Sequence, residues 1–172
     1  IFQGIYTILA IIVGGLWSYM LYVRRRQRYP RANLSHALAH RALVGNKVLL
    51  HVRVSIFNPG EVLLTLRKGE VWIQQILPVT PQLMAHIEAG NDPVIEGRRE
   101  VDWPLICSRS TNLEENRLEL EPGETHSIDY DFIIEKHIRC IEIYSVYWSG
   151  MRTKHDLVWN LVTIHDLNYA DN

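Results

Sequence analysis

The sequence predicts an antiparallel β-sandwich of seven or eight strands, preceded by one transmembrane helix. Three observations predict this fold class. The first residues form an almost unbroken apolar run, later segments place apolar residues at every second position, and turn-forming Asn, Pro and Gly residues separate those segments. Because the segments alternate instead of being apolar throughout, the pattern favours an antiparallel sheet over a parallel one.

The transmembrane helix is predicted over residues 1–23. The run Ile1–Val23 contains no Asp, Glu, Lys or Arg. At about 1.5 Å per residue it reaches ~34 Å, enough to cross a hydrocarbon core of roughly 30 Å. The run is too long for the apolar core of a signal peptide, and no small-residue cleavage site follows it.

A basic segment follows the apolar run and predicts the orientation of the chain. Arginines next to a membrane span stay on the cytoplasmic side, so we expect an inner (cytoplasmic) membrane protein with its N-terminus outside and its C-terminal domain in the cytoplasm. The same arginines are placed to meet anionic lipid headgroups. Together with aromatic rings that prefer the headgroup region, the predicted membrane-interface residues are Trp17, Tyr19, Tyr22, Arg24, Arg25, Arg26, Arg28 and Tyr29.

A stripe of small residues marks one face of the predicted helix. Ala10, Gly14 and Ser18 follow one another at intervals of four. Small side chains at this spacing let another helix approach closely in lipid, so the stripe predicts packing against a partner helix. Anchoring without a partner is the alternative, since Gly and Ala are common in membrane helices.

The rest of the chain has the length of one domain. Residues 24–46 form a basic juxtamembrane segment, whose alternating part is either an edge strand or a linker, and residues 47–168 form the sandwich. Expected strands are Lys47–Phe57, Val62–Leu66, Glu70–Leu77, Arg117–Leu120, Thr125–Ile134, Arg139–Trp148 and Asp156–His165. Turns are expected at Asn58–Glu61, Lys68–Glu70 and Glu121–Glu124, a short surface helix within Pro78–Pro93, and a polar loop at Ser108–Asn116.

Composition and motifs predict no catalytic activity, no cofactor and no nucleic-acid partner. The chain sums to −1, so with five arginines beside the membrane the domain itself is acidic and lacks a basic face for nucleic acid. The histidine pair His36 and His40, and the two His-Asp dipeptides at 155–156 and 165–166, lack the further ligands that a metal site needs. Neither Cys107 nor Cys140 lies in a catalytic or zinc-binding sequence, and no nucleophile elbow or phosphate loop is present.

Two of the expected strands carry apolar residues on both faces, which a strand buried on one side does not need. In Glu70–Leu77 and Arg139–Trp148, one face fits the sandwich core. The opposite face predicts a protein interface, because an exposed apolar patch usually marks an interaction site. The candidate interface residues are Trp72, Ile76, Tyr144 and Trp148.

The exit from the predicted helix is Arg26-Gln27-Arg28-Tyr29-Pro30. In this basic, Tyr- and Pro-containing stretch, and in its plan of one helix followed by a β-rich cytoplasmic domain, the chain resembles the H subunit of purple-bacterial photosynthetic reaction centres. The resemblance covers the first thirty residues and assigns no functional residue. The strand Val52–Asn58 and the turn Glu121–Glu124 resemble those of immunoglobulin- and fibronectin-type sandwiches, which implies an immunoglobulin-like fold and no particular function.

These features predict a non-catalytic accessory subunit of an integral membrane complex, with other membrane subunits as partners and no small-molecule substrate. The resemblance implies a photosynthetic reaction-centre, light-harvesting or respiratory complex as the host. The alternative is a free-standing, membrane-anchored β-sandwich module that recruits a protein or peptide, with Pro78–Pro93 as a recruiting loop. A third hypothesis is a lipid or small-molecule carrier with a cavity between its sheets.

Overall fold

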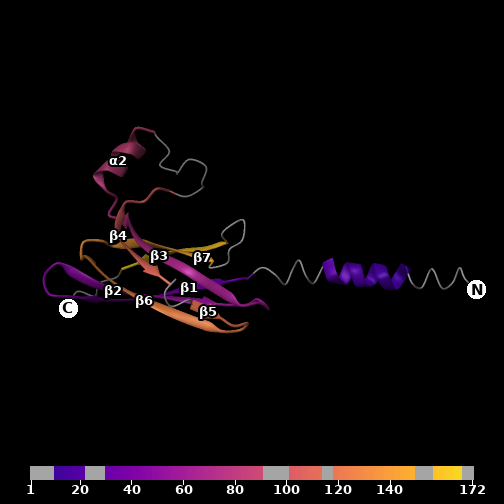
Figure 1. Ribbon diagram of the computed structural model, residues 1–172. Coiled ribbons are helices and arrows are strands. Elements are labelled where there is room, and N and C mark those ends of the chain that lie inside the picture. The colour runs from indigo at the N-terminus through magenta and orange to yellow at the C-terminus, as the bar shows by residue number, and fades with distance from the viewer. Residues whose placement is uncertain (1–9, 22–29, 91–100, 114–117, 150–156, 168–172) are drawn as a thin grey trace, which may run out of the picture.

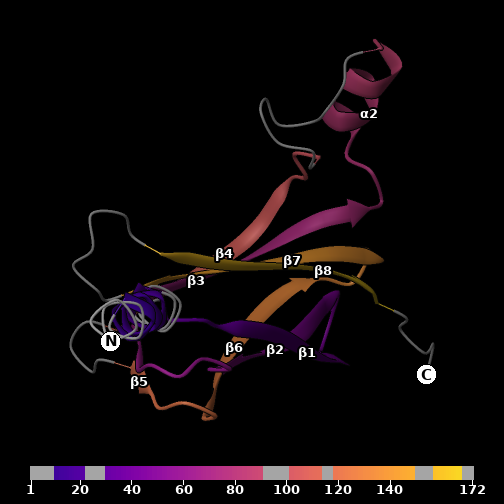
Figure 2. The same ribbon diagram turned by 90° about the vertical axis from the view of Figure 1, so that its right-hand side faces the viewer.

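The computed structural model describes residues 10–21, 30–90, 101–113, 118–149 and 157–167. The described residues between 30 and 167 fold into two antiparallel β-sheets stacked on each other (Figures 1 and 2). One sheet has three strands in the order β1-β2-β6. The other has five strands, with β4-β3-β7-β8 in order and β5 paired to β3. The prediction of an all-β, antiparallel, two-sheet fold is confirmed.

Eight strands and one short helix make up this part of the chain. The three-stranded sheet consists of β1 (Asn33–Ala42), β2 (Lys47–Phe57) and β6 (Thr125–Glu135). The five-stranded sheet consists of β3 (Leu64–Leu77), β4 (Leu105–Asn112), β5 (Leu118–Leu120), β7 (Cys140–Ser149) and β8 (Val158–Asp166). Helix α2 (Pro81–Glu88) lies between β3 and β4 in the sequence.

The core lies between the sheets because each strand turns its alternate apolar residues toward the other layer. In β2 these are the fully buried side chains of Val48, Leu50, Val52, Val54 and Ile56. Opposite them β7 contributes Ile141, Ile143 and Tyr147. The Tyr147 hydroxyl lies 3.3 Å from the Tyr130 hydroxyl, to which the Thr111 hydroxyl donates over 3.0 Å. The core therefore satisfies its buried polar atoms internally.

The outer face of the three-stranded sheet is charged and solvated. Across β2 and β6, Arg53 donates to Asp129 over 2.7 Å, His51 lies 2.8 Å from Asp131, and Lys47 pairs with Glu135. Such exposed pairs contribute little free energy individually. They keep one side of the sandwich polar.

Two predictions about the five-stranded sheet were wrong. The expected turn Lys68–Glu70 lies inside the continuous strand β3. There Gly69 is buried because the Tyr147 ring packs against its backbone: a Cβ atom at Gly69 would lie 2.4 Å from Tyr147 Cε1. The expected polar loop Ser108–Asn116 is largely strand β4, whose Ser and Thr residues suit an edge strand.

The predicted turn at Asn58–Glu61 is present and depends on a fully buried side chain. Asn58 Oδ1 accepts from the Gly60 N–H over 2.9 Å, and Asn58 Nδ2 donates to the carbonyls of Val62 and Leu120, each over 2.9 Å. Its backbone accepts from the Gly123 N–H over 2.8 Å. Asn58 thus ties this turn to the second predicted turn, in which Gly123 adopts a positive φ of 82°.

Replacing Asn58 with alanine is expected to lower the free energy of unfolding by about 3 kcal/mol, because three backbone groups, one buried and two half-buried, lose their partner at once. Chemical denaturation of the purified chain measures this change. Ser55→Ala on the outer face of the same strand loses one hydroxyl contact of 2.9 Å to Ser127. It serves as the control and should cost less than about 1 kcal/mol. Equal losses in the two variants would contradict the structural role given to Asn58.

Helix α2 confirms the short helix expected within Pro78–Pro93. Thr80 is its N-cap: the Leu83 N–H donates to Thr80 Oγ1 over 3.4 Å, and Pro81 occupies the first turn. The helix lies at the far end of the β3–β4 ribbon, away from the two stacked sheets (Figure 2). Leu83 is buried, whereas Met84 and Ile87 are exposed.

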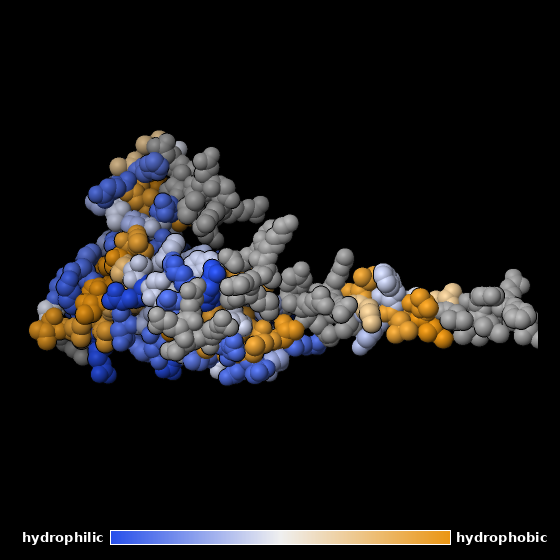
Figure 3. Space-filling model, viewed as in Figure 1, coloured by the Kyte–Doolittle hydropathy of each residue, from blue (hydrophilic) through white to orange (hydrophobic). Residues whose placement is uncertain are grey.

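Residues 10–21 are helical, and their side chains are exposed all round the helix. In the space-filling view this segment is mainly apolar (Figure 3). Among the residues that the structure describes, no helix is both long and apolar enough to cross a membrane. The remainder of the predicted span, residues 1–9 and 22–23, lies outside the described residues.

Candidate functional site

Three of the four predicted interface residues, Trp72, Tyr144 and Trp148, lie together on the outer face of the five-stranded sheet. Trp72 on β3 stacks on Tyr144 of β7, with ring centroids 5.2 Å apart and planes inclined by 28°. Lys68 Nζ lies 5.2 Å from the centroid of Trp148. Ile76 is farther along β3, where a bulge between Gln75 and Leu77 interrupts the register, and is half-buried.

Strand β8 extends this apolar surface, a contribution that the sequence did not predict. Its Val158 pairs with Trp148, and its Val162 pairs with Tyr144. Ile164, paired with Glu142, is 62% exposed. Paired residues in an antiparallel sheet project to the same side, so these side chains form one surface. We call it the outer patch, defined as Trp72, Tyr144, Trp148, Val158, Val162 and Ile164. The alternating pattern of β8 is visible in the sequence, but only the β7–β8 register shows which residues of β8 lie beside Tyr144 and Trp148.

The predicted helix-packing residues Ala10, Gly14 and Ser18 lie in the described helical segment and are exposed. A Cβ atom at Gly14 would have nothing within 4 Å. Of the predicted membrane-interface residues, Trp17 and Tyr19 are described, and both are exposed. Tyr22, Arg24, Arg25, Arg26, Arg28 and Tyr29 lie outside the described residues.

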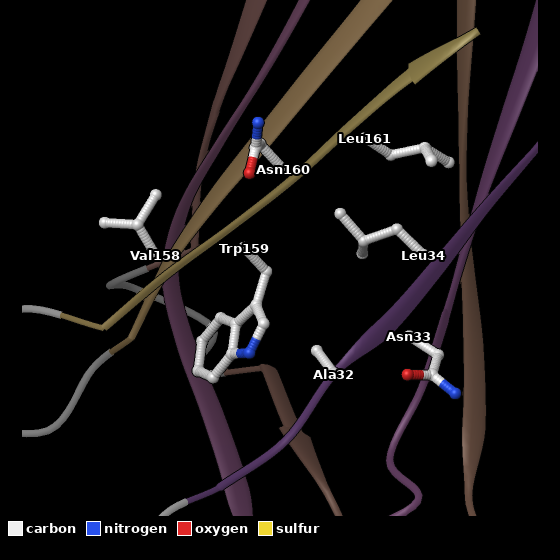
Figure 4. Close-up of a pocket in the computed structure, with 7 residues that line it drawn as sticks. All are labelled: Ala32, Asn33, Leu34, Val158, Trp159, Asn160 and Leu161. Atoms are coloured by element: carbon white, nitrogen blue, oxygen red, sulfur yellow. The ribbon is translucent and has the colours of Figure 1, made fainter.

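A second feature lies at one side of the sandwich, where the edge strands of the two sheets run next to each other. His36 on β1 contacts Thr163 on β8, and two positions earlier on each strand Leu34 and Leu161 face each other (Figure 4). The strands therefore run in the same direction. Between them is a groove of about 440 Å³, lined by Ala32, Asn33, Leu34, Val158, Trp159, Asn160 and Leu161. We call this side of the molecule the β1–β8 seam.

A chain of polar side chains continues the seam beyond the groove. His36 Nδ1 lies 2.7 Å from Thr163 Oγ1, His36 Nε2 lies 2.8 Å from Ser145 Oγ, and Thr163 Oγ1 lies 2.9 Å from His165 Nε2. Burial, and secondarily the neighbouring His165, lowers the pKa of His36 to about 4. Burial also lowers the pKa of His165. Both histidines stand out in the sequence, but their spacing gives no sign that residues more than a hundred positions apart come together.

The Ser145–His36 pair has the spacing of a nucleophile and its base, yet its surroundings do not suit catalysis. Ser145 is fully buried, so no substrate reaches its hydroxyl in this conformation. The group that orients His36 is a neutral hydroxyl, where a catalytic triad has a carboxylate. The pair acts as a structural contact between the sheets.

The other reactive side chains likewise lack the environment of a reactive site. Burial raises the pKa of the Cys107 thiol, and burial together with a hydrogen bond to Asp166 raises that of Cys140 to about 11. Both thiols are therefore protonated near neutral pH and are weak nucleophiles. Within the described parts of the chain, no three His, Cys, Asp or Glu side chains are grouped so as to hold a metal ion.

No protein-family model matches this chain, and no curated protein matches it. Among solved structures, a structural-genomics target named SoR45 is 9% identical over 85% of this chain and 97% of its own, with a TM-score of 0.48. A protein from Archaeoglobus fulgidus is 5% identical over 83% of this chain and all of its own, with a TM-score of 0.35.

A β-glucosidase from Erythrobacter marinus is 16% identical over 78% of this chain, with a TM-score of 0.31. The matching region is 15% of the β-glucosidase chain. At these TM-scores the similarities carry no argument about activity.

Proposed function

We propose that this chain is a non-catalytic accessory subunit of an integral membrane complex, held in the membrane by its N-terminal helix and docked to a partner protein through the outer patch. The observation that carries the proposal is the outer patch itself. Trp72, Tyr144 and Trp148 form a half-buried aromatic group on the outer face of the five-stranded sheet, and Ile164 on the neighbouring strand is 62% exposed. An aromatic cluster of this kind is typical of the central residues of protein interfaces.

The helical segment supports the membrane part of the proposal. Ile11, Leu16 and Trp17 are 69%, 57% and 68% exposed, and they point to different sides of the helix. A helix that is apolar all round is stable in lipid or inside a protein and is unfavourable in water. The arginines that follow would then lie at the cytoplasmic surface, with the sandwich on the same side.

The strand order supports an immunoglobulin-like fold for the sandwich. The orders β1-β2-β6 and β4-β3-β7-β8 correspond to the A-B-E and C′-C-F-G sheets of that fold. In this assignment the outer patch lies on the C′-C-F-G face. A photosynthetic or respiratory host complex remains a prediction of the resemblance in the first thirty residues.

Replacing Ile164 with lysine tests the outer patch. We expect at least a tenfold drop in partner proteins that co-purify after mild detergent extraction, because a bound partner would remove water from the new charge on the outer patch. Ile133→Lys is the matched control: Ile133 is 63% exposed and lies on the outer face of the other sheet. Partner identification by native electrophoresis and mass spectrometry of the wild-type band would supply the host complex.

A wild-type chain that migrates alone after gentle extraction would overturn the subunit proposal. It would favour the alternative, a membrane-anchored binding module. The observation in favour of that alternative is helix α2, which exposes Met84 and Ile87 at 43% and 46% away from the stacked sheets. A module of that kind would capture its partner through α2, and Met84→Lys rather than Ile164→Lys would abolish capture.

A further inference from the structure

We propose that the hydrogen-bonded side chains Ser145, His36, Thr163 and His165 form an acid-sensitive latch that holds β1 against β8, and that protonation of His36 opens the β1–β8 seam. The proposal is independent of the proposed function. It rests on two contacts that link the sheets, from His36 to Thr163 over 2.7 Å and from His36 to Ser145 over 2.8 Å, and on a third of 2.9 Å between Thr163 and His165 within β8.

The latch is complete when His36 is neutral. One arrangement of hydrogens satisfies all three contacts: the Ser145 hydroxyl donates to His36 Nε2, His36 Nδ1–H donates to Thr163 Oγ1, and the Thr163 hydroxyl donates to His165 Nε2. A second proton on His36 removes the acceptor for Ser145. Because Ser145 is fully buried, water does not reach its hydroxyl to replace that acceptor.

The charged form of His36 is also poorly compensated. Strand β7 presents Ser145 to it, β8 presents Thr163 and His165, and its register partner on β2 is the apolar Val54. His165 is therefore the titratable group facing it, and a charge there repels a charge on His36. His40 lies on the same face of β1, four positions away. In the described structure the polar partners of the His36 ring are two hydroxyls and no carboxylate.

The pH window follows from the direction of the pKa changes. The pKa of His36 falls from its ordinary 6.5 to about 4 in the folded chain, and that of His165 falls as well. The folded, latched state therefore binds fewer protons than an opened state between these values. The latch is fully effective above about pH 6.5 and weakens progressively as the pH falls toward 4.

Opening is expected to be local. Leu34, Leu38 and Trp159 are only partly buried where they pack against the core, whereas the core residues of β2 are fully buried. Segments with few buried contacts open at lower free energy than the core of a domain. The hydrogen bonds of the latch are thus the interactions at this edge that depend most on pH.

Hydrogen exchange of the full chain in mild detergent, followed by mass spectrometry at pH 7 and pH 5, tests the latch. After correction for the intrinsic exchange rate, we expect protection of β1 and β8 to fall about tenfold at pH 5, with β3 and β6, which pair with neither strand, unchanged. In His36→Gln, which stays neutral, this pH dependence should disappear. His126→Gln, at an exposed position on β6, is the matched control and should behave as wild type.

Two results would overturn the proposal. The first is an unchanged loss of protection in His36→Gln. The second is a His36 pKa at or above 6.5 in the wild-type chain, measured by NMR titration of its ring protons. This measurement does not depend on whether the variant folds. A His36 pKa well below 6.5, together with a pH effect on β1 and β8 that leaves β3 and β6 unchanged, would support it.

Discussion

Replacing Gly69 with alanine is expected to lower the free energy of unfolding by about 3 kcal/mol, one of the largest effects of a single methyl group in this domain. The added Cβ would lie 2.4 Å from Tyr147 Cε1 and 2.8 Å from Cδ1. Tyr147 is fully buried and its hydroxyl contacts Tyr130, so the ring has no free space to enter. Thermal unfolding should show a midpoint lowered by about 10 °C.

A control variant and a rescue variant distinguish the effect of this close contact from the general effect of replacing a glycine. Gly123→Ala places a Cβ where nothing lies within 4 Å, and its cost of about 1 kcal/mol arises from its positive φ of 82° alone. In a double-mutant cycle, Tyr147→Leu should offset part of the Gly69→Ala loss, because the smaller side chain leaves room for the methyl group. Strict additivity of the two substitutions would contradict the packing described for Gly69.

Placing arginines at Ile12 and Leu16 together is expected to abolish stable membrane insertion. The two side chains are 54% and 57% exposed on the helical segment and lie near the centre of the predicted span. Each arginine near the middle of a membrane helix costs about 2.5 to 3.5 kcal/mol, so the pair should shift the partition by about 10⁴ toward the non-inserted form. Extraction of membranes with alkaline carbonate followed by immunoblotting measures the change.

The matched control for insertion is Gly14→Leu, which keeps the segment apolar. We expect this variant to stay in the membrane fraction. If the helix packs against a partner helix through Ala10, Gly14 and Ser18, the variant should no longer associate with that partner. If the double arginine variant stays in the membrane pellet like wild type, the segment 1–23 does not anchor the chain by crossing the bilayer.

The comparison of sequence and structure is clearest in the five-stranded sheet. The period-two pattern of Lys47–Phe57 predicted β2 with its bounds, since one face of that strand is core and the other is solvated. The same approach divided β3 at Gly69 and missed most of β4. A glycine between two charged residues looks like a turn, and a polar edge strand has no apolar alternation.

The candidate sites also include residues that the sequence predicted and residues that only the structure identified. Trp72, Tyr144 and Trp148 were predicted as one surface because each lies on the face opposite to core residues of its own strand, and the structure places them together. The contribution of Val158, Val162 and Ile164 required the β7–β8 register. The latch could not be predicted, because hydrogen bonds between His36, Ser145 and Thr163 join residues whose sequence positions carry no information about one another.

The sequence by itself determined the class of this protein: its alternation and turns predict an antiparallel β domain, and its apolar, arginine-flanked N-terminus predicts an anchor. These features are local, since the period of burial and the conformations of Asn, Pro and Gly act within a few residues. Only the tertiary structure decided which edges meet and which face is left open. Those features depend on strand order and register, and they arise from packing between segments far apart in the chain.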